Sequence, residues 1–223
     1  MLICTPSFWF AGNGCDVGVT LAQTVAKRIG IFGGAFDPPH AAHMALVQAA
    51  VADLQLDELR IVPTGQAWHK ARALSPAHHR LAMAQLAFSH LPRVVVDPRE
   101  TQRSGPSYTV DTLHELKAQW PDAELFLIMG EDQARALPSW HEWQEVLRLA
   151  IICVAEREDL TGARPRFIAP KSHESRFRRL QMSAMPVSAT NIRTRIAAHQ
   201  CVVPLVFEPV ARYIDDHHLY QTN

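Results

Sequence analysis

A glycine-rich turn between a short strand and a long helix constrains this chain more than any other feature. The segment Arg28–Phe32 is short and largely apolar, and it runs directly into Gly33 and Gly34. Two glycines let the backbone turn sharply and approach a ligand without a clash from a Cβ atom. Two prolines follow, and a segment rich in Ala, Leu, Met and Val has helical periodicity from His40 to about Leu54. The sequence therefore predicts a strand, a tight turn and a helix, in that order.

The same alternation of strand and helix continues along the chain. Apolar or β-branched runs predict strands at 58–63, 93–97, 124–129 and 151–155, and apolar periodicity predicts helices at 76–90, 108–119, 188–198 and 209–217. A further helix is expected from Ser139 to about Leu149, because Ser139 and Glu142 have capping-box spacing, and 157–181 is expected to be irregular. This order predicts an α/β fold: a Rossmann-like, doubly wound, mostly parallel sheet with helices on both faces and a small C-terminal helical part. In such folds ligands bind beyond the carboxyl ends of the strands.

Composition and charge exclude several classes of function. The chain has 223 residues, with 22 Lys and Arg against 22 Asp and Glu, so its net charge is zero and no broad surface for nucleic acid is expected. Its four cysteines are scattered and form no C-x-x-C, which argues against a disulfide framework and fits a reducing, cytoplasmic location. No apolar run approaches the roughly 20 residues needed to cross a bilayer, so no membrane partner is expected.

The chain divides into a short extension and one expected domain. Residues 1–26 contain a short apolar stretch without the basic start of a signal peptide, so they are expected to form an N-terminal extension of uncertain order or to be sequence upstream of the true start. Residues 27–223 have the length of a single domain. The histidine doublets at 78–79 and 217–218 are expected to face solvent, because adjacent residues do not share a helix face. Whether the chain is a monomer or a homo-oligomer stays open.

His40 and His43 lie three residues apart at the start of the helix that follows the glycine turn. This spacing places both imidazoles on one face of the helix near its N-terminus. The N–H groups and the positive dipole end at that point favour an anion. Two imidazole rings that donate hydrogen bonds or carry positive charge suit phosphate oxygens whose negative charge rises while a phosphate-containing group is transferred. The stretch is not the dinucleotide fingerprint G-x-G-x-x-G, because the third glycine is absent and two prolines intervene.

A second phosphate site is predicted near the C-terminal end of the chain. Ser188 is a good N-cap residue for the helix that follows, and Thr190 and Arg193 lie within its first turns. The start of this helix is another site that favours an anion, and an arginine can bind a phosphate through two parallel hydrogen bonds. The C-terminal residues and the two histidines lie far apart in the sequence. Together they predict one phosphate site that is built from both motifs.

The two motifs resemble those of the nucleotidyltransferase α/β-phosphodiesterase superfamily. Residues 34–43 match G-x-F-x-P-x-H-x-x-H, and 187–193 resemble I-S-S-T-x-I-R. Ala35, Ala42 and Ala189 depart from the usual residues, and each replaces a hydroxyl or a glycine without removing a charged group. The resemblance implies that His40 and His43 are catalytic and polarise the phosphates of ATP. It assigns ATP binding to Gly33, Gly34, Ala35, Phe36, His40, His43, Gly130, Asp132, Ser188, Thr190 and Arg193.

Three further stretches resemble the nicotinate-mononucleotide adenylyltransferase family: residues 106–109, 130–132 and 137–143. The resemblance implies that Trp140 stacks on the pyridine ring and that N–H groups near Thr109 bind its carboxylate. An aromatic plate suits an electron-poor ring, and the N–H groups at a helix start suit an anion. His141 stands where a tyrosine is common. The acceptor nucleotide is assigned to His69, Lys70, Tyr108, Thr109 and Trp140.

The implied reaction is attack by the phosphate of nicotinate mononucleotide on the α-phosphorus of ATP. Transfers of this kind depend on positioning and on charge neutralisation, and no protein nucleophile is assigned. Mg²⁺ is expected to be bound mainly through the ATP phosphates, because no carboxylate cluster is evident. Nicotinamide mononucleotide or another acceptor of the superfamily is an alternative substrate, and a non-catalytic nucleotide sensor is an alternative of another class. Arg176, Arg178 and Arg179 are interpreted as either a solvated face or a lid on the ATP side.

Overall fold

The computed structural model describes residues 26–66, 73–157, 167–182 and 185–221. Its centre is one six-stranded sheet in the order β3-β2-β1-β4-β5-β6, and every neighbouring pair of strands is parallel. The strands are β1 (Arg28–Gly34), β2 (Glu58–Pro63), β3 (Val94–Val96), β4 (Glu124–Gly130), β5 (Ala150–Arg157) and β6 (Phe177–Met182). This topology confirms the predicted Rossmann-like α/β fold.

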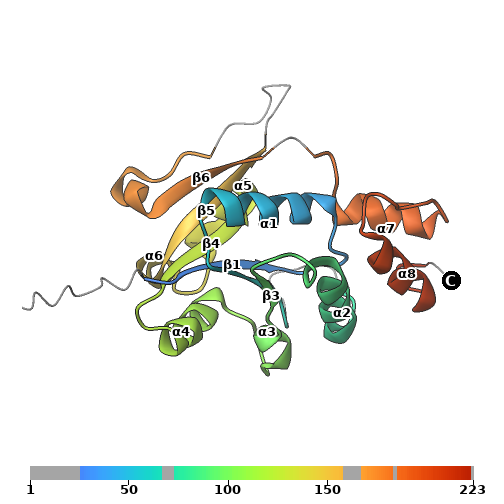
Figure 1. The fold of residues 1–223 in the computed structure, drawn as a ribbon, viewed down its shortest axis with the longest axis horizontal. Coiled ribbons are helices and arrows are strands. Elements are labelled where there is room, and N and C mark those ends of the chain that lie inside the picture. Colours follow the sequence, from blue (N-terminus) through green and yellow to red (C-terminus); the bar gives the residue numbers. More distant parts are fainter. Residues whose placement is uncertain (1–25, 67–72, 158–166, 183–184, 222–223) are drawn as a thin grey trace, which may run out of the picture.

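Helices cover both faces of the sheet, and Figure 1 shows α1 on one side and α4 on the other. The α-helices are α1 (Ala41–Asp53), α2 (Ala77–Phe88), α3 (Arg99–Gln102), α4 (Thr109–Gln119), α5 (Glu131–Ala136), α6 (Trp143–Leu149), α7 (Ala189–Ala197) and α8 (Glu208–Asp216). Two short 3₁₀ helices, η1 (Leu137–Ser139) and η2 (Lys171–Arg176), complete the described elements. The predicted C-terminal helical part is α7 and α8, which lie together beside the start of α1 (Figure 1).

Two apolar clusters, one on each face, form the core. Phe126 and Ile128 of β4 pack into the cluster that includes α1 and α2, whereas Leu125 and Leu127 pack into the cluster that includes α4 and α6. Successive residues of a strand point to opposite faces, so a strand covered on both faces is apolar throughout. This is why the strands of this chain read as continuous apolar runs.

The site predicted from the sequence lies where the strand order changes direction. β1 pairs with β2 on one side and with β4 on the other. The connection after β1 therefore leads toward one edge of the sheet, and the connection after β4 leads toward the other edge. The glycine turn follows β1, and Gly130 ends β4 next to it. The helix connections diverge at this point and leave room for a ligand beyond the strand ends.

Two local predictions are wrong. Ser139 does not cap a helix, because it ends η1 and its hydroxyl donates a hydrogen bond to the carbonyl oxygen of Ala136 at 2.7 Å. Helix α6 begins four residues later, after Glu142, whose backbone is left-handed with φ 49°. The stretch predicted to be irregular contains η2 and the edge strand β6. Only Leu180 of β6 is buried, so the strand has none of the apolar alternation that would reveal it.

Two bulk expectations can be compared with the described residues, and a third cannot. No helix among them is long and apolar enough to span a membrane. Both described cysteines, Cys153 and Cys201, are free. Residues 1–25 of the expected extension lie outside the described residues.

Candidate active site

The turn after β1 is held rigid by an aromatic side chain. Phe36 is 2% exposed, and its ring contacts Phe32 and Phe88 edge to face. Its backbone is left-handed (φ 48°), a conformation that a bulky residue adopts only where its surroundings enforce it. A Cβ atom on Gly34 would lie 3.1 Å from this ring, so glycine lets the turn fold back onto its own phenylalanine.

His40 and His43 form a stacked pair at the start of α1. Their ring centroids are 3.7 Å apart and the planes are inclined by 18°. His40 is the N-cap residue and is 6% exposed. Its backbone N–H donates a hydrogen bond to Nδ1 of His43 at 3.2 Å. Because Nδ1 accepts, the neutral ring of His43 carries its proton on Nε2, which is therefore its hydrogen-bond donor.

One expected donor at this helix start is already used. The backbone N–H of Ala41, the first residue of α1, donates to the carbonyl oxygen of Leu205 at 2.9 Å. This N–H group is therefore not available to an anion, and the helix start offers fewer backbone donors than predicted. Ala42, one of the departures from the superfamily pattern, is buried on α1.

The two phosphate motifs, far apart in sequence, are joined directly. Arg193 of α7 donates through Nη1 to the backbone oxygen of Asp37 at 2.8 Å, a contact between residues 156 positions apart. Its Nη2 donates to Oγ1 of Thr190 at 3.0 Å. Ser188 caps α7, because its Oγ accepts from the N–H of Asn191 at 3.2 Å, as predicted. Both helix starts therefore meet at the glycine turn.

The sequence did not predict three residues whose hydrogen bonds join segments of the candidate site: Asp37, Arg80 and Tyr220. Asp37 is 3% exposed, and its carboxylate accepts from the Tyr220 hydroxyl at 2.6 Å. Burial raises the pKa of Tyr220, and its hydrogen bond to the Asp37 carboxylate raises that pKa further. Asp37 lies inside the glycine motif, but nothing in the sequence pairs it with a residue near the C-terminus. Arg80 had one signal, since it falls on the apolar face of α2 with Met83 and Ala84.

The end of β4 contributes Gly130 and Asp132. Gly130 is the N-cap residue of α5, and a Cβ atom there would meet nothing within 4 Å. The side chain of Asp132 is 91% exposed and contacts Nη1 of Arg135 at 3.3 Å. Asp132 therefore has its carboxylate in solvent at the carboxyl edge of the sheet, where a nucleotide can reach it.

The residues predicted for the acceptor lie on two segments that meet. Tyr108 is the N-cap residue of α4, and Thr109 is the first residue of that helix. The ring of Tyr108 lies 4.4 Å from that of His141, between centroids. Trp140 is half-buried and packs against the apolar core cluster that includes residues of α4. The structure thus brings together the start of α4 and the segment 140–141, whereas His69 and Lys70 lie outside the described residues.

Of the three arginines near η2, Arg176 has a structural role, whereas Arg178 and Arg179 are exposed on β6 and fit the interpretation as a solvated face. Arg176 donates to the carbonyl oxygens of Leu147, Arg148 and Ala150, and so caps the end of α6. Arg178 lies over the ring of Phe126 at 5.6 Å, and Arg179 pairs with Glu156 at 3.2 Å. All three side chains have partners within β4–β6 and α6.

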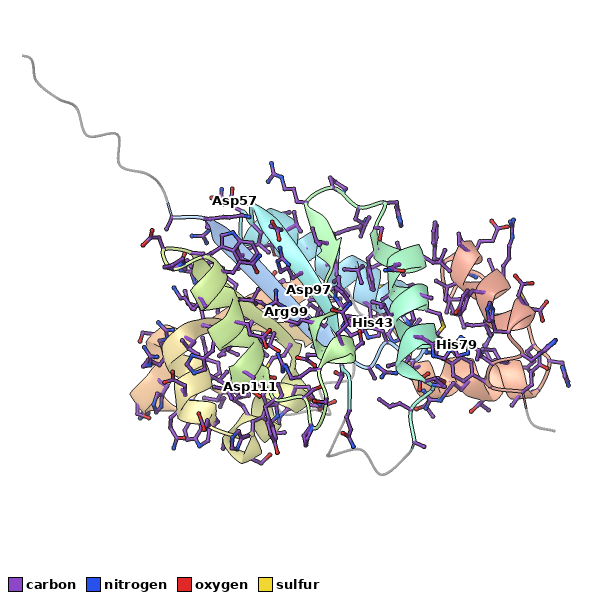
Figure 2. All side chains as sticks on the ribbon, turned by 90° about the horizontal axis from the view of Figure 1, so that it is seen from below. His43, Asp57, His79, Asp97, Arg99 and Asp111 are labelled. Atoms are coloured by element: carbon purple, nitrogen blue, oxygen red, sulfur yellow. The ribbon has the colours of Figure 1, made fainter. Side chains whose placement is uncertain are left out.

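The prediction that the histidine doublets face solvent holds for three of the four residues and is wrong for His79. His79 lies on the side of α2 that faces the C-terminal helices (Figure 2), and its Nδ1 is 2.9 Å from the hydroxyl of Tyr213. Partial burial and the charges of His78 and His217 lower the pKa of His79. His43 lies apart from this group, at the sheet. Among the described residues, no group of three His, Cys, Asp or Glu side chains has the geometry of a metal site.

Comparisons with known proteins agree with this architecture. A cytidylyltransferase-like family model matches residues 31–195. A protein of Albidiferax ferrireducens named "Probable nicotinate-nucleotide adenylyltransferase" is 72% identical over 196 residues, which cover 88% of this chain and 99% of that protein. A protein of Methylibium petroleiphilum with the same name is 44% identical, over 87% of this chain and 92% of the relative.

A solved structure shows the same fold. The nicotinic acid mononucleotide adenylyltransferase of Plasmodium falciparum, complexed with NaAD, aligns with a TM-score of 0.68 at 21% identity, over 88% of this chain and 98% of that one. The fold and the two joined helix starts define the chain as a nucleotidyltransferase of the cytidylyltransferase-like class. Within that class, it belongs to the nicotinate-nucleotide adenylyltransferase family.

Proposed function

We propose that this chain transfers AMP from ATP to nicotinate mononucleotide, which yields nicotinate adenine dinucleotide and pyrophosphate in NAD biosynthesis. The observation that carries the proposal is the hydrogen bond between Arg193 and the backbone of Asp37. This hydrogen bond joins the starts of α1 and α7 into one cationic site that is rich in hydrogen-bond donors. The site lies where the strand order of the sheet changes direction. The names of the relatives that are 72% and 44% identical support the choice of acceptor.

The phosphate side of the site neutralises charge during the transfer. An oxygen of the acceptor phosphate attacks the α-phosphorus of ATP, the new P–O bond forms, and the bond to the β-phosphate oxygen breaks to release pyrophosphate. Nε2 of His43, the ring of His40 and the guanidinium of Arg193 are the donors for the oxygens whose charge rises. The other ATP contacts assigned from the family motifs are Gly33, Gly34, Ala35, Phe36, Gly130, Asp132, Ser188 and Thr190.

The acceptor is assigned to the segments around Tyr108 and Trp140. The N–H groups at the start of α4 have no partners inside the helix, so they suit the pyridine carboxylate. Trp140 offers a flat apolar surface for the ring, beside the contact between Tyr108 and His141. His69 and Lys70 are proposed to bind the acceptor phosphate.

A divalent cation assists nucleotidyltransferases of this class, and Mg²⁺ is the ion we propose here. Mg²⁺ prefers oxygen ligands and keeps several of its waters. The buried carboxylate of Asp37 is bonded to Tyr220 and Ser75, and Asp132 contacts Arg135. The ion would therefore be held chiefly by phosphate oxygens and water, and the protein would contribute by holding the phosphates. The free cysteines and the soluble substrates fit a cytoplasmic enzyme of one domain over residues 27–223.

The test is release of pyrophosphate from ATP and Mg²⁺ with each mononucleotide in turn. We expect release with nicotinate mononucleotide, a lower kcat/KM with nicotinamide mononucleotide, and no release after chelation of the metal. An equal or higher kcat/KM with nicotinamide mononucleotide would overturn the choice of acceptor. Binding of ATP without release with any acceptor would favour a nucleotide sensor.

A further inference from the structure

Arg80 is a buried cation inside the molecule, outside both phosphate motifs. It lies on the inner face of α2 and is 1% exposed, next to the fully buried Met83 and Ala84. Burial lowers the pKa of its guanidinium, and the nearby charge of Asp37 raises it again. A buried charge is costly unless its hydrogen bonds are made, so its partners indicate why it is there.

Those partners are four backbone carbonyl oxygens on three segments of the chain. Nη1 donates to Ala35 at 3.1 Å, in the glycine turn, and to Thr64 at 2.6 Å, just after β2. Nη2 donates to Gly65 at 3.0 Å, and Nε donates to Ser75 at 2.8 Å. The planar guanidinium suits this task, because its donors have a fixed geometry.

Asp37 makes a second link between the same segments. Its Oδ2 accepts from the backbone N–H of Ser75 at 3.3 Å, while its Oδ1 accepts from Tyr220. The N–H of Thr64 donates to the carbonyl oxygen of Gly34 at 2.8 Å. The glycine turn and the segment after β2 are therefore joined through side chains as well as through backbone.

The segment after β2 continues this connection to the acceptor side. The N–H of Ser107 donates to the carbonyl oxygen of Gln66 at 3.1 Å, and Gln66 forms a parallel bridge with Pro106. Tyr108 and the start of α4 come directly after these residues. A continuous line of contacts thus runs from the ATP turn through Arg80 and Gly65 to the start of α4.

We propose that Arg80 and Asp37 form a clamp that sets the position of the acceptor site relative to the ATP turn, and that both are positioning residues for the transfer. The inference rests on the proposed function, because it assigns ATP to the turn and the acceptor to the start of α4. In-line transfer requires the attacking oxygen to lie about 3–3.5 Å from phosphorus, and a misplacement of about 1 Å costs on the order of 10²-fold in rate.

The test compares Arg80→Lys with a matched variant, Arg176→Lys. Both arginines bind backbone carbonyl oxygens, but Arg176 binds them at the end of α6, away from the turn. Lysine keeps the charge and cannot reach four carbonyl oxygens on three segments. We expect Arg80→Lys to lower kcat by about 10²-fold while the Kd of each substrate, measured alone, stays within about threefold. Arg176→Lys is expected to keep wild-type turnover per folded molecule.

Two results would overturn the clamp: turnover of Arg80→Lys within about threefold of wild type, or a loss that appears wholly in the Kd of one substrate. Should Arg80→Lys fail to fold, Tyr220→Phe decides, since it removes only the hydroxyl bonded to Asp37. A kcat roughly tenfold lower with unchanged Kd values supports the clamp, and wild-type kcat refutes it.

Hydrogen exchange separates failure of the clamp from failure of the proposed function. In Tyr220→Phe, the N–H groups of Thr64 and Ser107 are expected to lose protection together, because both belong to the connected segments. This readout needs no turnover, so it decides the clamp even if the wild-type chain releases no pyrophosphate with any acceptor. Unchanged protection at both positions would refute it.

Discussion

Replacement of His43 is the sharpest test of the phosphate site. The His43 ring stacks on His40 at 3.7 Å, contacts Phe36 at 5.3 Å and accepts the N–H of His40 through Nδ1. His43→Ala therefore removes two things: a hydrogen-bond donor for the phosphate, and the acceptor that caps α1. These two losses must be separated before the change in rate can be interpreted.

The magnitudes differ enough to separate them. Loss of one well-placed donor to a developing negative charge lowers kcat by about 10²–10³-fold, or about 2.7–4 kcal/mol. Loss of the cap lowers the free energy of unfolding by about 1 kcal/mol. His43→Gln is the matched control, because glutamine at this position can reach back to the N–H of the N-cap residue, whereas alanine cannot. Its amide is then used by the cap, so the donor to phosphate is still lost.

The assay measures pyrophosphate release per folded molecule, with unfolding in urea measured in parallel. We expect kcat to fall by about 10²–10³-fold in His43→Ala and to stay more than tenfold below wild type in His43→Gln. The free energy of unfolding is expected to fall in the alanine variant alone. Turnover of His43→Ala within tenfold of wild type would show that His43 does not stabilise the transition state.

Three further predictions concern stability. Ser188→Ala removes the cap of α7 and is expected to lower the free energy of unfolding by about 1 kcal/mol in urea, whereas no change would refute the cap. Gly65→Ala places a Cβ atom 2.0 Å from the backbone oxygen of Glu100, so we expect a loss of about 3 kcal/mol or more; a loss below 1 kcal/mol would contradict this packing. Burial raises the pKa of Glu100 to about 7 from its ordinary 4.5, so the folded protein binds this proton more tightly than the unfolded chain; stability is therefore lost as pH rises from about 4.5 through 7. In urea unfolding, wild type should lose about 3 kcal/mol relative to Glu100→Gln over that range, and parallel pH profiles would disprove the shift.

The order of strands and helices could be predicted because each element carries its own periodicity. Strands such as β4 are apolar throughout, since both faces of the sheet are covered. β6 could not be predicted, because this edge strand buries only Leu180 and exposes Arg178 and Arg179. The capping box at Ser139 failed for a different reason. Its spacing is correct, but the left-handed backbone of Glu142 ends the preceding turn before α6 begins.

The residues of the candidate site also divide into those that the sequence could predict and those that it could not. Its motifs could be predicted, because His40 and His43, or Ser188 and Arg193, lie within one helix turn or two of each other. The groups that hold those motifs in place could not, because their partners are distant or are backbone atoms. Arg80 binds carbonyl oxygens, which every residue possesses, so no residue type identifies its partners. The Asp37–Tyr220 contact joins residues 183 positions apart.

The C-terminal segments hold the proposed ATP site and are not an appendage to it. Three separate groups from them hold the glycine turn and the start of α1: the guanidinium of Arg193, the carbonyl oxygen of Leu205 and the hydroxyl of Tyr220. A tight turn with a left-handed phenylalanine keeps its conformation only where its surroundings enforce it. Chemistry that depends on positioning therefore needs both ends of the described chain, because one end supplies the turn and the other fixes where its donors point.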